Sequence, residues 1–170
     1  DVAVGGGTGG DEMEDWGITQ EYTLSIPAIS MRAPVLLPSR RYWDARMWRM
    51  LEKQMQAGLR EGVVAYPHSS VPEDIGSLII AGHSSPPDAL SADSEYSEVF
   101  ARLPELQEGD KISVNHNGST IKYEVISSIV VSPTHTDILR QQSKEGILKL
   151  ITCFPIGTTT SRMIVTAKRI

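Results

Sequence analysis

Most apolar residues of the chain fall in short runs, and one segment has the spacing of an amphipathic helix. In residues 43–60 the apolar side chains recur every three or four positions: Met47, Trp48, Leu51, Met55 and Leu59. This spacing places them on one face, so we predict a single helix over this segment, with Gly62 just past its end. A second, shorter apolar face over residues 94–103 predicts another helix, which Pro104 ends.

The remaining apolar runs are short and bounded by Gly, Pro and Asn, which is typical of β-strands. The predicted strands cover residues 22–29, 33–37, 63–65, 76–81, 111–115, 121–131, 148–152 and 163–167. Asn117-Gly118 lies between two of them and is a strong hairpin signal, because both residue types tolerate the positive φ of a tight turn. Many strands and few helices predict a mainly β protein, a mainly antiparallel barrel or sandwich.

The chain of 170 residues has a formal net charge of −5, and this charge is unevenly distributed. Residues 1–21 contain six acidic residues and no Lys or Arg, and five of the first ten positions are glycine. Such a segment buries too little apolar surface to offset the entropy of ordering it, so we predict a flexible acidic arm over residues 1–21. Its first 17 residues suit either a native tether or a remnant of cloning or processing. Residues 22–170 are nearly neutral and are predicted to form one folded domain.

The composition excludes several functional classes. A single cysteine excludes an intrachain disulfide framework and a cysteine-based metal site. A sequence pI near 5.4 argues against nucleic-acid binding, and no apolar run is long enough to span a membrane. We predict no cofactor, because no glycine-rich phosphate loop is present. The scattered loop acids leave a weak calcium site open: Glu73, Asp74, Asp88 and Asp93.

Three residues near predicted strand ends are candidates for chemistry. Cys153 follows the strand at 148–152 and His83 follows the strand at 76–81, so both side chains are expected at the rim of a barrel. Histidine is the natural acid–base partner of a thiol, and Arg162 at the start of the last strand could donate to a developing oxyanion. Each also has an ordinary interpretation, as a buried structural thiol, a surface histidine or an exposed arginine.

Taken together, these stretches resemble the sortases, the cysteine transpeptidases of bacterial cell surfaces. The segment at 76–83 ends in Ala-Gly-His and resembles the strand that delivers the catalytic histidine of the family. Residues 149–153, Lys-Leu-Ile-Thr-Cys, resemble the Thr-Leu-x-Thr-Cys signature, with Lys149 in place of its first Thr. Arg162 precedes Met-Ile-Val, and the matches run in family order over residues 22–170. The Asp-Pro-aromatic lid motif of pilin-polymerising sortases is absent.

The resemblance implies an eight-stranded sortase-type β-barrel with a few short helices, formed by a catalytic domain at residues 22–170. It implies that Cys153 is the nucleophile, His83 the general acid/base, and Arg162 the residue that stabilises substrate and oxyanion. Thr152 is expected to line the substrate site beside the thiol, and the loop at 133–146 to form a wall for the sorting signal. It also implies an extracytoplasmic enzyme of the bacterial cell surface. We expect the full-length protein to be membrane-anchored through a segment that this chain lacks.

The expected reaction is cleavage of a Leu-Pro-x-Thr-Gly-like sorting signal through a thioester acyl-enzyme. The acyl group is then expected to join an amine of a peptidoglycan cross-bridge or a pilin lysine. The expected partners are therefore surface proteins that carry such a signal, together with the amine acceptor, and no nucleic acid. Two alternatives stay open at this point: a cysteine peptidase that acts only by hydrolysis, and a catalytically silent surface-binding module of the same fold.

Overall fold

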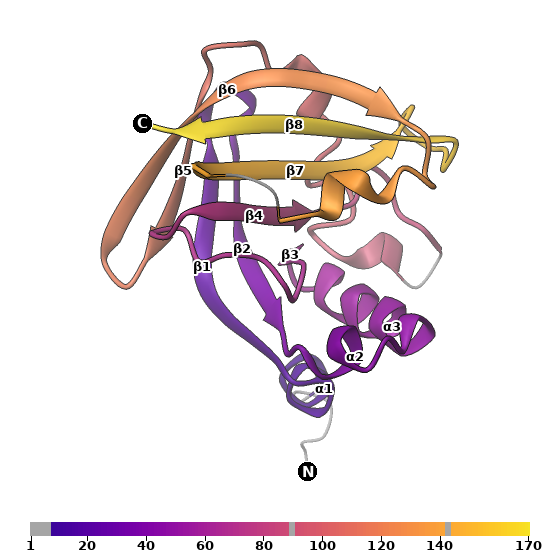
Figure 1. Ribbon diagram of the computed structural model, residues 1–170. Coiled ribbons are helices and arrows are strands. Elements are labelled where there is room, and N and C mark those ends of the chain that lie inside the picture. The colour runs from indigo at the N-terminus through magenta and orange to yellow at the C-terminus, as the bar shows by residue number, and fades with distance from the viewer. Residues whose placement is uncertain (1–7, 89–90, 142–143) are drawn as a thin grey trace.

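The computed structural model describes residues 8–88, 91–141 and 144–170, and its strands form a closed eight-stranded barrel (Figure 1). The strands are β1 (Ile18–Ile26), β2 (Met31–Pro38), β3 (Val63–Ala65), β4 (Gly76–Ala81), β5 (Lys111–His116), β6 (Ser119–Val131), β7 (Gly146–Phe154) and β8 (Ser161–Arg169). The α-helices are α1 (Thr8–Trp16), α2 (Arg41–Asp44) and α3 (Trp48–Leu59). Short 3₁₀ turns are η2 (Pro27–Ile29), η3 (Ser91–Asp93), η4 (Leu103–Glu105) and η5 (Thr136–Leu139). The predicted mainly β fold, an eight-stranded barrel with a few short helices, is confirmed.

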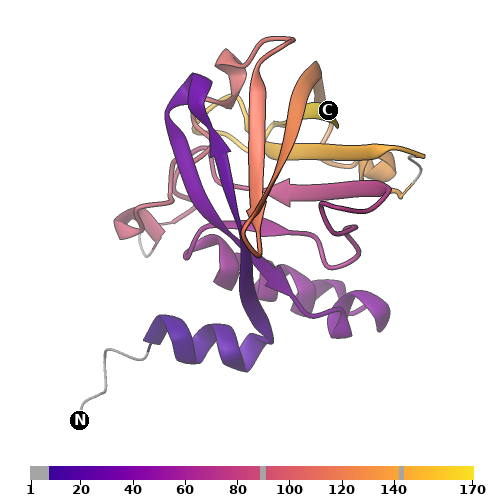
Figure 2. The same ribbon diagram turned by 90° about the vertical axis from the view of Figure 1, so that its left-hand side faces the viewer.

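The strand order around the barrel is β1-β2-β3-β4-β7-β8-β6-β5. The prediction of a mainly antiparallel barrel is confirmed, with two parallel pairs, β2 with β3 and β4 with β7. In Figure 2 the upright strands β1, β2 and β5 lie in front of the horizontal strands β4 and β7. A parallel pair needs a long crossover connection, and the chain between β4 and β7 supplies it with the whole β5–β6 hairpin.

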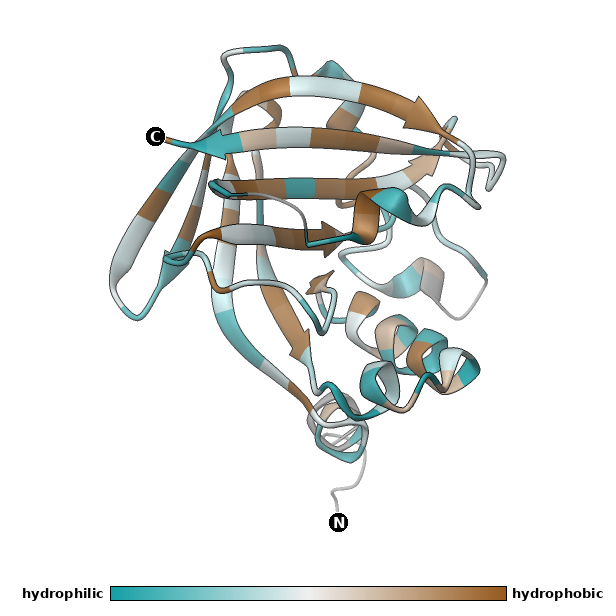
Figure 3. Ribbon diagram, viewed as in Figure 1, coloured by the Kyte–Doolittle hydropathy of each residue, from teal (hydrophilic) through white to brown (hydrophobic). Residues whose placement is uncertain are grey.

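Apolar residues alternate with polar residues along β1 from Tyr22 to Ile26 and along β5, whereas β3 and β4 are buried along nearly their whole length (Figure 3). The inward positions fill the barrel with fully buried side chains from all parts of the chain: Leu24, Ile80, Phe100, Val114, Leu148 and Val165. The predicted β5–β6 hairpin is confirmed at Asn117 and Gly118, whose φ angles are both positive, 51° and 82°.

The segment at 43–60 forms two helices where the sequence predicts one. Arg46 has a φ of 57°, which an L residue seldom adopts and which no α-helix accepts, so the chain turns there between α2 and α3. The predicted apolar stripe is correct for Leu51 and Met55, which are buried against the outside of the barrel. Trp48 remains 54% exposed at the start of α3.

The helix predicted over residues 94–103 is wrong, since this segment is a series of turns that ends in η4. The Ser94 hydroxyl accepts from the Tyr96 N–H (3.1 Å) and donates to the Arg60 carbonyl (2.8 Å), so the side chain offers the backbone an alternative to a helix. The apolar residues of the segment are nevertheless core residues, because Phe100 and Leu103 are fully buried.

The described part of the predicted flexible arm also differs from the prediction. Helix α1 occupies Thr8–Trp16, and β1 begins at Ile18, four positions before the predicted start. Met13 and Trp16 pack against the cluster that includes Leu51, and Glu12 forms an ion pair of 2.7 Å with Arg60. The composition of the segment does not predict this helix, because only two apolar side chains, Met13 and Trp16, pack it against the rest of the protein. Residues 1–7 lie outside the described residues. None of the helices in the described ranges is long and apolar enough to cross a membrane.

Gln54 on α3 generates a test of this packing, because its buried amide links three elements. Its Nε2 donates to the Trp16 carbonyl at 2.8 Å and to the Ser39 hydroxyl at 3.3 Å. We expect Gln54→Ala to lower the free energy of unfolding by about 1–3 kcal/mol in urea denaturation, since the partly buried Trp16 carbonyl loses its donor. The exposed neighbour Lys53 is the control, and Lys53→Ala should change stability by less than about 0.5 kcal/mol. Equal losses in the two variants would contradict this role.

Candidate active site

The parallel pair β4–β7 brings two strand ends to the same edge of the barrel. The register aligns Ala81 with Ile151, and the Gly82 N–H continues the ladder by donating to the Ile151 carbonyl at 3.1 Å. The Thr152 hydroxyl donates to the Gly82 carbonyl at 2.8 Å in a fully buried bond. The segment after β4 and the end of β7 therefore stay hydrogen-bonded to each other up to the candidate catalytic residues.

His83 is held beside Cys153 by bonds on both sides of it. Beyond His83, the Ser84 hydroxyl donates to the Cys153 carbonyl at 2.9 Å. The His83 carbonyl accepts from the N–H of the buried Phe100 at 2.9 Å. With Gly82 and Ser84 both tied to β7, the backbone of His83 has little freedom, and its position relative to the thiol is set by the sheet.

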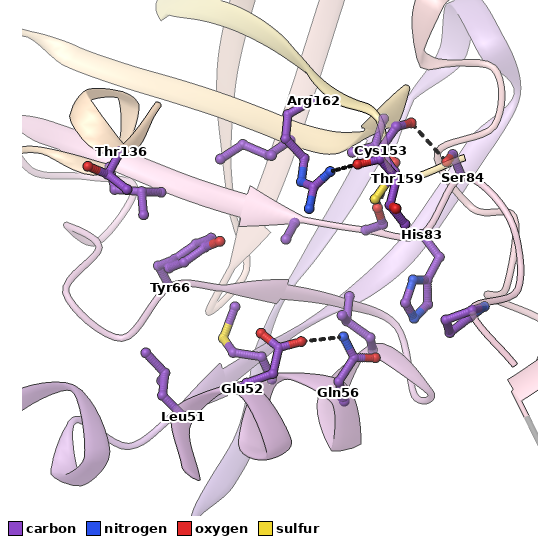
Figure 4. Close-up of a pocket in the computed structure, with 18 of the residues that line it drawn as sticks. Leu51, Glu52, Gln56, Tyr66, His83, Ser84, Thr136, Cys153, Thr159 and Arg162 are labelled. Atoms are coloured by element: carbon purple, nitrogen blue, oxygen red, sulfur yellow. Dashed lines mark hydrogen bonds between the residues drawn. The ribbon is translucent and has the colours of Figure 1, made fainter. Parts of the chain in front are cut away.

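Arg162 reaches the thiol from the other side of β7. The antiparallel pair β7–β8 places Cys153 and Arg162 directly opposite each other. The Arg162 Nη1 donates to the carbonyls of Thr159 (3.2 Å) and Ser161 (3.1 Å), which fixes the guanidinium over the loop between the two strands. In Figure 4 the side chains of Cys153, His83 and Arg162 face the same cavity. Strands β4, β7 and β8, adjacent in the barrel, thus supply the histidine, the thiol and the arginine.

All four site residues predicted from the sequence line one cavity of about 1390 Å³: His83, Thr152, Cys153 and Arg162. Thr152 is 3% exposed, and its hydroxyl is used on the Gly82 carbonyl, so the structure gives it a bond that holds the two strand ends together. One wall of the cavity comes from α3 and the opposite wall from the segment at 136–141. This segment belongs to the loop that the sequence predicts as a wall.

Burial changes the acid–base behaviour of His83. It lowers the pKa of His83 below the ordinary histidine value, while the nearby carboxylates of Asp88 and Glu52 partly oppose the shift. The Nε2 atom is buried and makes no hydrogen bond within the described residues. A neutral imidazole with one uncommitted nitrogen can give or take a proton at a reacting group.

Two lining residues were missed by the sequence analysis. Tyr66 follows the short strand β3, and Glu52 lies on the polar side of α3, with its carboxylate directed into the cavity in Figure 4. Burial raises the pKa of Tyr66, with Glu52 adding to the shift and Arg162 opposing it, so the phenol is neutral at neutral pH. The sequence carries no signal for either residue, because only the folded chain brings α3 and the end of β3 to this cavity.

A metal site finds no support in the described ranges. They contain no group of three or more His, Cys, Asp or Glu side chains that could hold an ion. The loop acids considered for calcium therefore do not come together as a ligand set.

The matched family agrees with this geometry. The family model of the sortase domain matches residues 24–170, which is most of the chain. The chain belongs to the sortase family. The match extends from β1 through β8 and includes the strand ends that carry the histidine, the thiol and the arginine.

Individual sortases are similar to this chain at moderate identity. Sortase D of Bacillus subtilis (strain 168) is 28% identical over 115 residues, which are 66% of this chain and 52% of that protein, so the chain spans about half of its length. Sortase C-1 of Actinomyces oris has a TM-score of 0.66 and 27% identity, over 88% of this chain and 73% of that one. Sortase A of Corynebacterium diphtheriae has a TM-score of 0.69 and 26% identity, over 89% of this chain and 61% of that one. These relatives carry three different class letters, so they support the family and not one class.

The close packing of Gly82 gives a test of how His83 is positioned. A Cβ at Gly82 would lie 2.6 Å from the ring of Phe100, which is fully buried and cannot move aside. We expect Gly82→Ala to cost about 1–3 kcal/mol of unfolding free energy and to reduce the reactivity of the site. In a double-mutant cycle with Phe100→Leu, the combined loss should be smaller than the sum of the single losses, because the smaller side chain makes room. Simple additivity would show that the contact does not matter.

The lowered pKa of His83 predicts a dependence of stability on pH. The pKa is lower in the folded than in the unfolded state, so the unfolded state binds the proton more tightly. This histidine costs the fold nothing above its ordinary pKa, and it destabilises the fold as the pH falls through that value toward the folded pKa. We expect the loss of unfolding free energy between about pH 7.5 and pH 5 to be smaller in His83→Asn than in the original protein. NMR titration of the His83 ring should give a midpoint below 6.5; a midpoint above it would contradict the prediction.

Proposed function

We propose that this sortase domain is a cysteine transpeptidase with Cys153 as nucleophile, His83 as general acid/base and Arg162 as oxyanion and substrate stabiliser. The observation that carries the proposal is the convergence of three adjacent strand ends on one cavity, with Cys153 and Arg162 as cross-strand neighbours. The uncommitted Nε2 of His83 supports the acid/base role, since a proton carrier needs a free ring nitrogen.

The first half of the proposed reaction forms the acyl-enzyme. The sulfur of Cys153 attacks the carbonyl carbon of the Thr–Gly bond in a Leu-Pro-x-Thr-Gly-like signal, and its proton passes to His83. The guanidinium of Arg162 donates to the carbonyl oxygen as it gains negative charge. The C–N bond then breaks, His83 gives its proton to the leaving glycine nitrogen, and a thioester remains on Cys153.

The second half of the proposed reaction transfers the acyl group. A primary amine attacks the thioester carbon, the C–S bond breaks, and the electron pair returns to the sulfur of Cys153. His83 accepts a proton from the incoming nitrogen, which is the reverse of its role in the first half. The thioester suits this exchange because it stores the acyl group and still reacts readily with an amine.

The proposal includes the setting in which the enzyme works. The donors are surface proteins with a C-terminal sorting signal, and the acceptor is an amine of a peptidoglycan cross-bridge or of a pilin lysine. The site of action is the extracytoplasmic side of a bacterial cell. Residues 22–170 form the catalytic domain of this proposal, and the acidic residues 1–21 precede it, with Ile18–Glu21 contributing the start of β1.

The experiment combines a sorting-signal peptide with the protein and detects a covalent adduct by mass spectrometry. We expect an adduct on Cys153, a cleaved peptide, and a ligated product when an amine is added. Cys153→Ala should lose cleavage and ligation by a factor of at least about 10³, since no other group can form the thioester. A matched control is Ser132→Ala, which changes one exposed residue outside the lining of the cavity.

The outcomes separate the competing functions. A ligated product supports a transpeptidase, whereas cleavage that never yields an amide with any added amine identifies a hydrolase. A folded protein whose thiol neither forms an adduct nor reacts with iodoacetamide at neutral pH contradicts both enzymatic functions.

A further inference from the structure

Glu52 is the single acidic side chain among the described residues that line the cavity. The other charged side chains of the lining are Arg140, which is paired with Asp137 at 3.2 Å, and Arg162, whose guanidinium is bonded to carbonyls and not to a carboxylate. Figure 4 shows the Glu52 carboxylate pointing from α3 into the cavity, across from Arg162 and Cys153 and toward the side of His83. The mechanism of cleavage as proposed above does not use this carboxylate.

One oxygen of the Glu52 carboxylate accepts a hydrogen bond from within α3, and the other oxygen is available. The Gln56 Nε2, one turn further along α3, donates to Oε2 at 2.9 Å. Within the described residues no hydrogen bond engages Oε1 of Glu52, and no cation forms an ion pair with it. A carboxylate that faces the cavity without a cation partner can accept an external cation.

Aromatic rings next to Glu52 favour the same kind of ligand. Trp48 lies one turn before Glu52 and is 54% exposed, and its ring packs edge-on against Trp43 at 5.7 Å. Trp43 in turn stacks on His68 at 4.0 Å, and Tyr66 packs edge-on against Trp43 at 6.4 Å. Tryptophan and tyrosine rings attract ammonium groups through their negative faces, so this end of the cavity attracts cations in a second, independent way.

We propose that Glu52 and the neighbouring Trp48 bind the ammonium group of the incoming acceptor amine and guide it along α3 to the acyl-enzyme. This inference rests on the proposed transpeptidase function and names the route of its second substrate. A primary amine is an ammonium ion at neutral pH, and the guanidinium of Arg162, which is bonded to carbonyls and not to a carboxylate, repels it. Glu52 reduces that repulsion from α3, across the cavity from the thiol.

The protons of the acceptor balance in this arrangement. The ammonium nitrogen carries three protons and the amide product keeps one, so two must leave. One passes to His83 before the nitrogen attacks the thioester carbon. The second leaves the nitrogen as the C–S bond breaks and goes to the sulfur of Cys153. Glu52 takes neither proton, and its part is to hold the cation until His83 deprotonates it.

The experiment measures the ratio of aminolysis to hydrolysis of the acyl-enzyme with charged and uncharged nucleophiles. Glycine amide and Nα-acetyl-lysine amide represent the cross-bridge and the pilin acceptor, and hydroxylamine is mostly uncharged at neutral pH. We expect Glu52→Gln to lower this ratio about fivefold for the two cationic amines, which is the upper range for a solvent-exposed ion pair. The ratio with hydroxylamine should not fall, and the difference between variants should shrink as salt is raised.

Two further variants sharpen the test. Glu52→Asp retains the charge and should recover part of the ratio, while Glu108→Gln removes an equal charge from an exposed turn outside the lining and should leave every ratio unchanged. If Glu52→Gln lowers the ratio more for one of the two cationic amines, that amine is the acceptor that Glu52 binds better.

The inference is wrong if Glu52→Gln leaves the ratio with both cationic amines unchanged. It is also wrong if the ratio with hydroxylamine falls equally, because Glu52 would then act through His83 and not on the charge of the acceptor. Either result would still be compatible with an acyl-enzyme on Cys153. Failure of the transpeptidase proposal is distinguishable, since the original protein would then form no adduct on Cys153 at all.

Discussion

The site depends on one constraint, the parallel pairing of β4 with β7. Parallel strands end at the same edge of a sheet, so residues about 70 positions apart, His83 and Cys153, leave the barrel together. Side chains alternate between the two faces of a strand, and Thr152 turns inward while Cys153 turns to the cavity. A slip of one residue in this pair would therefore exchange them. The bonds of Gly82 and Ser84 to β7 make such a slip costly, because buried polar groups would lose their partners.

The cavity combines two requirements that oppose each other. Proton transfer by His83 needs a partly dry site, and burial there favours the neutral imidazole. Binding a cationic amine needs water access and a nearby carboxylate. The structure separates the two along the cavity, with His83 near the strand ends and Glu52 on the exposed side of α3. Because Glu52 is exposed, its pull on the acceptor is moderate and reversible, which suits a substrate that must move on.

Sequence patterns identify the strands and the residues that meet at the cavity, because both are local or ordered signals. Turn residues bound each strand, and the order of His83, Cys153 and Arg162 matches that of a known family. The sequence predictions are wrong where a single distant contact or an unusual backbone conformation determines the local structure. The break at Arg46 is a backbone conformation that periodicity does not encode, and the turns at 94–103 are favoured by a serine hydroxyl bonded to Arg60. Glu52 was missed because only the folded chain brings α3 across from the strand ends.

Lys149, which departs from the family signature, has a structural role in the fold. Its Nζ donates to the Ile138 carbonyl at 2.9 Å, a reach that the threonine of the signature is too short to make. Desolvation lowers the pKa of Lys149, so this bond forms in a partly dry setting where it is strong. Gln141 anchors the same loop through bonds to the backbone of Ser77 on β4. The wall of the cavity is thus fastened to β7 and β4, the strands that deliver the thiol and the histidine. Wall and reacting groups consequently share one rigid support, and an acyl chain held by the wall stays in register with the thiol.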